Sequence, residues 1–179
     1  MEKSKELLKL ARDMIKSHLY GEKIKVNDEI KKKYSKKQAC FVTLTEKGKL
    51  RGCIGSLQAC QELWKDIIDN SIHAAFDDAR FDSLSKNELD KIKIEISILS
   101  IPLKLKYTDP DDLINKIDNK MGIVLKSGLY SATFLPQVWE ELPNKIEFLE
   151  NLSRKAGLSC DAWKQGCEIM FYRVESFKE

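Results

Sequence analysis

Two residues that could do chemistry stand two positions apart in the stretch KLRGCIGSL, residues 49–57: Arg51 and Cys53. The stretch resembles a strand, in which side chains two apart share a face at a separation of about 7 Å. A guanidinium beside a thiol favours the thiolate and can itself bind an anion. We therefore take Arg51 and Cys53 as candidate catalytic residues. The alternative is a half-buried cysteine with an arginine that pairs with a carboxylate across the sheet.

The element that must position them is a hairpin, ACFVTL-TEKG-KLRGCIG. A type I turn with a glycine bulge at Gly48 would place Thr43 opposite Arg51 and Phe41 opposite Cys53. In this register one face collects Cys40, Val42, Leu44, Leu50, Gly52 and Ile54, and the other collects Phe41, Thr43, Thr45, Lys49, Arg51 and Cys53. Thr43 then becomes a candidate ligand-binding residue. Gly52 falls on the apolar face, where a small residue would let a helix pack closely.

A second hairpin, MGIVL-KSG-LYSATFL, aligns with the first without a gap when Gly128 is set under Gly48. The counterparts of Arg51, Gly52 and Cys53 are Ser131, Ala132 and Thr133. Both copies keep a small residue in the middle, and only the first carries arginine and thiol. The pattern predicts one domain, residues 1–179, with repeats over about 38–100 and 119–176. We expect an internal duplication that shares an antiparallel sheet in an α+β fold.

Helical spacing and capping signals predict the remaining elements. Helices are expected over about 3–20, after Asn27 and Asp28, over about 61–76, from the capping box of Ser85 and Glu88 to Lys91, from Asp109 and Pro110, and between Pro136 and Gly157. Strands are expected at KIKIEISILS and at the C-terminal CEIMFYRV.

Composition excludes several classes of protein. The 179 residues are 42% hydrophobic, carry a formal net charge of +3 and contain no apolar run long enough to span a membrane. Five cysteines without a C-x-x-C spacing favour neither a disulfide framework nor a zinc site, and the charged N-terminal helix lacks a secretory pattern. We expect a soluble, cytoplasmic protein with reduced thiols. The basic run supports weak nucleic-acid binding as an alternative, through Lys31, Lys32, Lys33, Lys36 and Lys37.

Other catalytic constellations are weaker. A cysteine hydrolase would need a base, but His18 lies on the apolar stripe of the first helix and His73 on a polar helix face. His73 and Asp77 have a metal-binding spacing without a third ligand, so no metal or cofactor is predicted. The three tryptophans, Trp64, Trp139 and Trp163, lie in helical patterns typical of core residues.

The hexapeptide LRGCIG (Leu50 to Gly55) resembles the hallmark motif of the AMMECR family. Further similar blocks follow in family order: AAFDDARF (74–81), EISIL (95–99), KMG (120–122), FLPQV (134–138) and KAGLSCDAW (155–163). The chain departs from the family at Ala79, where proline is usual, and at Asn119, where glycine is usual. The second departure bears on the loop before the second hairpin.

The resemblance implies an α+β fold with two lobes and a cleft, in a cytoplasmic protein. Bacterial and archaeal members are called system protein A of a set with a Memo-like protein and a radical S-adenosylmethionine enzyme, which makes these two the candidate partners. The family has no established reaction, so whether this chain is an enzyme stays open.

The leading hypothesis is a cleft site around Arg51 and Cys53 that binds an anionic small molecule or a partner's side chain. Thiol chemistry at Cys53 would extend it. The first alternative is a non-catalytic adaptor for the two partners, and the second is the nucleic-acid-binding regulator.

Overall fold

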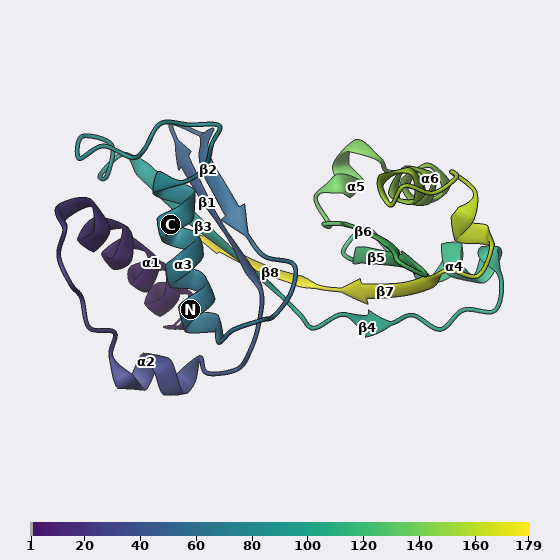
Figure 1. Cartoon of the computed structure of the whole chain (residues 1–179), viewed down its shortest axis with the longest axis horizontal. Coiled ribbons are helices and arrows are strands. Elements are labelled where there is room, and N and C mark those ends of the chain that lie inside the picture. The colour runs from purple at the N-terminus through teal and green to yellow at the C-terminus, as the bar shows by residue number, and fades with distance from the viewer. Residues whose placement is uncertain (1) are drawn as a thin grey trace. The chain divides into compact units, whose positions relative to one another are not determined.

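The structure is a computed structural model that describes residues 2–179. The amphipathic N-terminal segment forms helix α1 (Glu2–Tyr20), as predicted. Helix α2 (Asp28–Lys33) follows, with the Asn27 side chain accepting from the Glu29 amide as N-cap. The third helix of this region is α3 (Leu63–Phe76). Both α1 and α3 lie on one face of a sheet (Figure 1).

That sheet has the strand order β2-β1-β3-β8 and belongs to a first unit made of residues 2–99 and Glu175–Glu179. Its strands are β1 (Cys40–Glu46), β2 (Lys49–Gly55), β3 (Ile92–Leu99) and β8 (Val174–Lys178). The inward residues of β1 and β3 are fully buried, among them Val42, Leu44, Ile94 and Ile96. The alternation of apolar and polar residues therefore fixes which face of the sheet meets α1 and α3.

Gly52 is where α3 comes closest to β2. A Cβ built on Gly52 would lie 2.0 Å from the carbonyl oxygen of Ala74 in α3. The prediction that Gly52 serves helix packing is therefore confirmed. Gly55, the last residue of β2, is also crowded, since its Cβ would lie 2.4 Å from the Phe41 ring.

The second unit, Ser100–Val174, has its own sheet with the order β4-β7-β5-β6. The strands are β4 (Leu103–Lys104), β5 (Gly122–Ser127), β6 (Tyr130–Phe134) and β7 (Glu168–Tyr172). The helices are α4 (Pro110–Lys116), α5 (Val138–Glu141) and α6 (Lys145–Lys155), followed by the 3-10 turn η1 (Ala162–Lys164). Trp139 and Trp163 are buried in this core, and the Trp139 ring stacks on Phe148.

The α+β class with antiparallel pairing is confirmed, but the strands form two sheets instead of one shared sheet. Each hairpin lies beside a further strand, β1 and β2 beside β3, and β5 and β6 beside β7. The chain then crosses over, because β4 follows β3 yet pairs with β7, and β8 follows β7 yet joins the β3 sheet. Sequence periodicity marks strands without saying which sheet they enter. The duplication itself stays a prediction.

The predicted register of the first hairpin is wrong. The turn has two residues, Lys47 and Gly48, both with positive φ (51° and 77°), which is typical of a type I′ turn. Glu46 pairs with Lys49, and a bulge shifts the register between Leu44 and Thr45. As a result Thr43 faces Cys53 instead of Arg51. A lysine in the left-handed conformation is uncommon, and we expected the glycine alone to take it.

The segment after α3 also differs from the prediction. Only one half of the predicted capping box forms: the Ser85 amide donates to the Glu88 carboxylate at 2.8 Å, but the Ser85 hydroxyl also donates to that carboxylate, and the Glu88 amide donates to the Ser85 backbone carbonyl. Residues 86–90 nevertheless form turns and no helix. A short helix gains few hydrogen bonds for its costly first turn, and here Glu88 has a second partner. None of the described helices is long and apolar enough to cross a membrane.

Candidate functional site

Arg51 is the extra residue of the β2 bulge, because Leu44 pairs with Gly52 and Thr45 pairs with Leu50. Bulges redirect a side chain without ending a strand. The Arg51 guanidinium extends to the loop after α3, where Nε donates to Glu88 at 2.7 Å and Nη2 donates to the Asp82 carbonyl at 2.8 Å. Its side chain is only 13% exposed. This contact matches the alternative interpretation of Arg51, in which the arginine pairs with a carboxylate, although that carboxylate lies in a loop and not across the sheet.

The Glu88 carboxylate accepts hydrogen bonds from both Arg51 and Ser85. The Arg51 guanidinium, with help from the Ser85 amide and hydroxyl, lowers the pKa of Glu88 from its usual 4.5 to about 2. The Arg51 Nη1 atom, by contrast, is buried and has no hydrogen-bond partner among the described residues. Buried donors of a charged group are normally satisfied, so this nitrogen calls for an explanation.

Cys53 lies in different surroundings. Its Sγ atom is 3.3 Å from the Thr43 hydroxyl, across the pair that the corrected register creates. No hydrogen bond or ion pair between Arg51 and Cys53 occurs in residues 2–179. The structure thus brings Thr43 to Cys53 and directs Arg51 elsewhere.

The cation that does reach Cys53 is Arg80. The Asp78 carboxylate accepts from the Cys53 amide at 2.9 Å, and Arg80 Nη2 donates to the Cys53 carbonyl at 3.2 Å. Arg80 also holds Asp78 through Nε and Nη2, at 2.9 and 2.7 Å. Asp78 and Arg80 therefore occupy both outward groups of an edge strand, as a neighbouring strand would.

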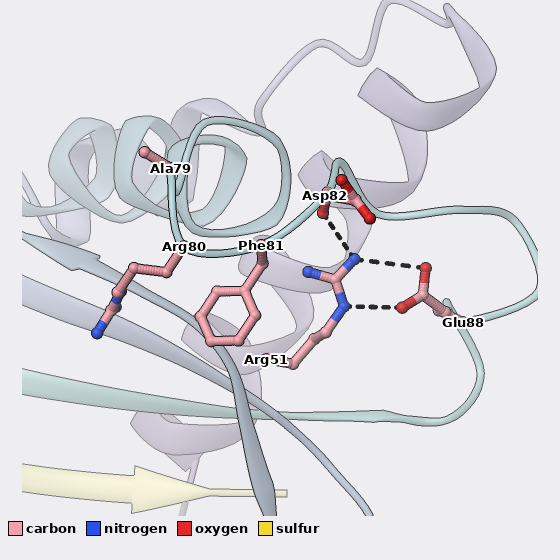
Figure 2. A pocket seen from close by; sticks show the side chains of 6 residues that line it. All are labelled: Arg51, Ala79, Arg80, Phe81, Asp82 and Glu88. Atoms are coloured by element: carbon pink, nitrogen blue, oxygen red, sulfur yellow. Dashed lines mark hydrogen bonds and ion pairs between the residues drawn. The ribbon is translucent and has the colours of Figure 1, made fainter.

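A surface pocket of about 480 Å³ lies between this loop and β2. Its lining residues are Arg51, Ala79, Arg80, Phe81, Asp82 and Glu88. Figure 2 shows the Phe81 ring between the two arginines, and their Cζ atoms are 5.9 Å (Arg51) and 5.5 Å (Arg80) from its centroid. The unpaired Nη1 of Arg51 lies on the Phe81 side of its guanidinium (Figure 2). Cys53 and Thr43 do not line this pocket.

Of the six lining residues only Arg51 was selected from the sequence, and the side chains of Arg80, Phe81 and Glu88 are the important ones that were not. A signal for each was present, since Arg80 and Phe81 end the AAFDDARF block and Glu88 closes the capping box. What the spacing could not indicate was that the loop folds back on the bulge of β2.

A second pocket of about 440 Å³ lies near the start of α3. It contains the exposed Cys60 and the exposed His73, and behind them Asp66 is buried. Asp66 accepts from the Cys40 amide at 2.8 Å and from Asn70 at 3.0 Å, so it fastens α3 to β1. His73 has only a 4.0 Å approach to Asp77. Among the described residues, no three His, Cys, Asp or Glu side chains are grouped to hold a metal ion.

The basic run is partly neutralised within the first unit. Lys31 pairs with Asp28 at 2.9 Å, and Lys33 pairs with Glu6 at 2.7 Å. The remaining lysines of the run, Lys32, Lys36 and Lys37, are exposed.

We expect the Arg51 and Glu88 pair to make stability depend on pH. A carboxyl whose folded pKa is lowered contributes stability above its unfolded pKa, near 4.5, and loses it as pH falls toward about 2. Glu88→Gln should therefore lower the free energy of unfolding at pH 7 and flatten its decline between pH 4.5 and 2. Urea unfolding at several pH values measures both, with the exposed Glu140→Gln as control. Identical pH slopes for Glu88→Gln and the parent protein would contradict the pairing.

Comparison with known proteins gives a consistent result. A family model described as AMMECR1 matches residues 8–177. A protein of Nanoarchaeum equitans is 38% identical over 177 residues, covering 97% of this chain and 98% of its own length. A protein of Aquifex aeolicus is 38% identical over 180 residues, covering 98% and 92%. The crystal structure of an uncharacterized protein from Pyrococcus horikoshii has a TM-score of 0.81 at 31% identity, covering 99% of this chain and 92% of that one.

Proposed function

This chain belongs to the AMMECR1 family, and from the geometry of the pocket we propose that it binds an acidic small molecule in the space lined by Arg51, Phe81 and Arg80. The observation that carries the proposal is the Nη1 atom of Arg51, buried, unpaired and directed to the Phe81 side of the pocket (Figure 2). A carboxylate or phosphate oxygen would satisfy this donor once a shift of the Phe81 side chain uncovers it. Charge-assisted hydrogen bonds of this kind are the strong ones.

The two arginines would contact the ligand in different ways, Arg51 from a fixed position and Arg80 from an exposed one. Arg51 is held rigidly by Glu88 and by the Asp82 carbonyl, so binding requires little reordering of its side chain. Arg80 has a side chain that is 56% exposed and uses its Nε and Nη2 atoms on Asp78. Its remaining donor nitrogen is the one available to a ligand. The Phe81 ring offers the ligand an apolar wall.

The ligand competes with carboxylates already present. Glu88 and Asp78 neutralise much of the arginine charge, so a bare anion should bind weakly. The apolar wall of Phe81 favours an acid that also carries a flat or apolar group. An acidic side chain of a partner protein, such as the Memo-like protein or the radical enzyme that the family resemblance suggests, offers the same carboxylate.

Thiol chemistry at Cys53 has less support than binding. The Cys53 thiol lies against Thr43 and outside the pocket lining. Neither histidine is among the residues that contact it. We therefore propose a binding site without thiol chemistry. In this proposal Cys53 is a structural residue of the β2 edge, which anchors Asp78 and Arg80.

The proposal is tested by titrating the full chain with benzoate, which carries a flat apolar group, and with acetate as the bare anion that should bind more weakly, at constant ionic strength, while arginine Nε–H signals are followed by NMR. We expect saturable shifts of Arg51 and Arg80. Arg80→Gln should weaken binding about tenfold, which corresponds to about 1.4 kcal/mol for the loss of one charged contact. The matched control is Arg154→Gln, an exposed arginine paired with Glu150 in α6. Shifts that do not saturate, or that Arg154→Gln changes as much as Arg80→Gln, would overturn the proposal.

A further inference from the structure

The outer edge of β6 presents unpaired backbone groups. In the second unit β6 is an end strand, and a two-residue turn joins it to β5 at Gly128 and Leu129. Gly128 has φ 59°, as the first central residue of a type II′ turn requires. Ser127 and Tyr130 then form the closing hydrogen-bonded pair, and alternation along the strand turns the N–H and C=O groups of Ser131 and Thr133 outward.

Contacts to Thr133 agree with this assignment. Lys155 Nζ donates to the Thr133 carbonyl at 3.0 Å, from the side away from β5. Among the described residues, no protein group bonds to the Thr133 amide or to either backbone group of Ser131. Exposed groups of this kind bind water until a better partner arrives.

The first hairpin shows how the same position is covered elsewhere in the chain. Cys53 is the counterpart of Thr133 in the hairpin alignment, and both of its outward groups are taken, the amide by Asp78 and the carbonyl by Arg80. On β6, within residues 2–179, the hydrogen bond to an outward backbone group comes from the exposed side chain of Lys155. The second hairpin therefore lacks the loop that closes the edge of the first.

The residues of β6 also lack the usual protection of an edge. Edge strands commonly carry charges or proline, which discourage pairing with another strand. The edge strand β8 carries Glu175 and Lys178, and the edge strand β4 has only two residues. The β6 sequence, YSATF, has neither charge nor proline, and the adjoining Leu129 is fully exposed.

We propose that β6 pairs antiparallel with β6 of a second copy of this chain, with the two-fold axis at Ala132. Ser131 then forms a hydrogen-bonded pair with Thr133 of the partner subunit, and Thr133 pairs with Ser131 of the partner subunit. The outward groups stand symmetrically about Ala132, so the edge is complementary to itself. Lys155 releases the Thr133 carbonyl, and its ammonium remains near the Phe134 ring, which it already overlies at 4.8 Å.

The side chains favour a second copy over an unrelated strand. This register sets Tyr130 opposite Phe134 of the partner subunit, a cross-strand aromatic pair that occurs twice in the dimer. Because the strand is uncharged, self-pairing places no like charges opposite one another. The small side chain of Ala132 sits at the axis, where the two strands approach most closely.

Sedimentation equilibrium of the full chain across the micromolar range tests the proposal. We expect a monomer–dimer equilibrium that Ser131→Ala leaves unchanged, because the backbone amide remains. Ser131→Pro removes that outward amide from both copies without touching the β5 pairing, and should weaken the dimer about 10- to 100-fold. Lys155→Ala removes the competing donor and should tighten the dimer.

Amide hydrogen exchange of the unmodified chain provides a measurement that does not depend on a variant folding. The Ser131 and Thr133 amides should exchange more slowly as the protein concentration rises, while other exposed amides stay unaffected. A chain that is monomeric throughout, or a dimer that persists equally in Ser131→Pro and Ser131→Ala, would overturn the proposal. Exchange at these two amides that is independent of concentration would do the same.

Discussion

Gly52→Ala should lower the free energy of unfolding by about 3 kcal/mol, the range of severe overpacking in a core. The added Cβ would lie 2.0 Å from the Ala74 carbonyl oxygen and 3.1 Å from its carbon, and both atoms belong to the α3 backbone. A flexible side chain could rotate away from such a contact, whereas α3 must move as a whole. That helix carries the buried Leu63 and Ile67, so its displacement disturbs the core of the first unit.

Urea denaturation of Gly52→Ala and of the parent protein measures the loss. The control is Leu50→Ala in the same strand, where the replaced side chain is 45% exposed and the cost should stay below about 1 kcal/mol. Should Gly52→Ala cost no more than Leu50→Ala, then α3 can shift at little expense and the close approach would not explain this glycine.

Gly52 was predictable because its role is local. A small residue on the apolar face of a strand implies that something packs closely against it, and the counterpart Ala132 supports this. The same kind of reasoning located most of the helices and strands, since amphipathic periodicity and capping residues act within a few positions of the chain. It missed the strands β4 and β8 and predicted a helix to Lys91 that does not form.

The hairpin register was not predictable from the same information. TEKG accommodates either a glycine-bulge turn or a two-residue turn, and the choice depends on whether Lys47 accepts a positive φ. The bulge at Arg51 adds a second shift. Together they exchange the partner of Thr43 from Arg51 to Cys53, which changes what the site contains.

The pocket itself depends on contacts far apart in sequence. Arg51 meets Glu88 across 37 residues, and the Cys53 amide meets Asp78 across 25. Spacing within a motif cannot reveal such pairs. A carboxylate partner for Arg51 was one of the two sequence interpretations, but it was expected across the sheet, and only the tertiary structure shows that the partner is Glu88 of the loop.

Asp78→Ala should destabilise the first unit by about 2 kcal/mol and open the edge of β2. The Asp78 side chain is only 5% exposed, and it accepts from the Cys53 amide and from the Arg80 side chain. The Arg80 guanidinium, followed by the Cys53 amide, holds the pKa of Asp78 well below its usual range. Without this carboxylate the Cys53 amide loses its acceptor and Arg80 loses the anchor that keeps it on the Cys53 carbonyl.

The opening should be visible at the Cys53 thiol. Alkylation of Cys53 by iodoacetamide, followed by peptide mass spectrometry, should be about tenfold faster in Asp78→Ala, as expected if local opening becomes easier by about 1.4 kcal/mol. Cys60 is exposed, so its alkylation rate in the same sample is a control for the reactivity of the reagent. Its rate should not change.

Asp77→Ala is the matched control, because it removes the neighbouring carboxylate, whose side chain is 62% exposed and only approaches His73 at 4.0 Å. It should alter neither stability nor the Cys53 rate. Asp78→Asn keeps an oxygen for the Cys53 amide but loses the charge that holds Arg80, so it should fall between the two. Equal Cys53 rates in Asp78→Ala and Asp77→Ala would mean that the loop stays on β2 without this carboxylate. The pocket wall formed by Arg80 and Phe81 would then need another support.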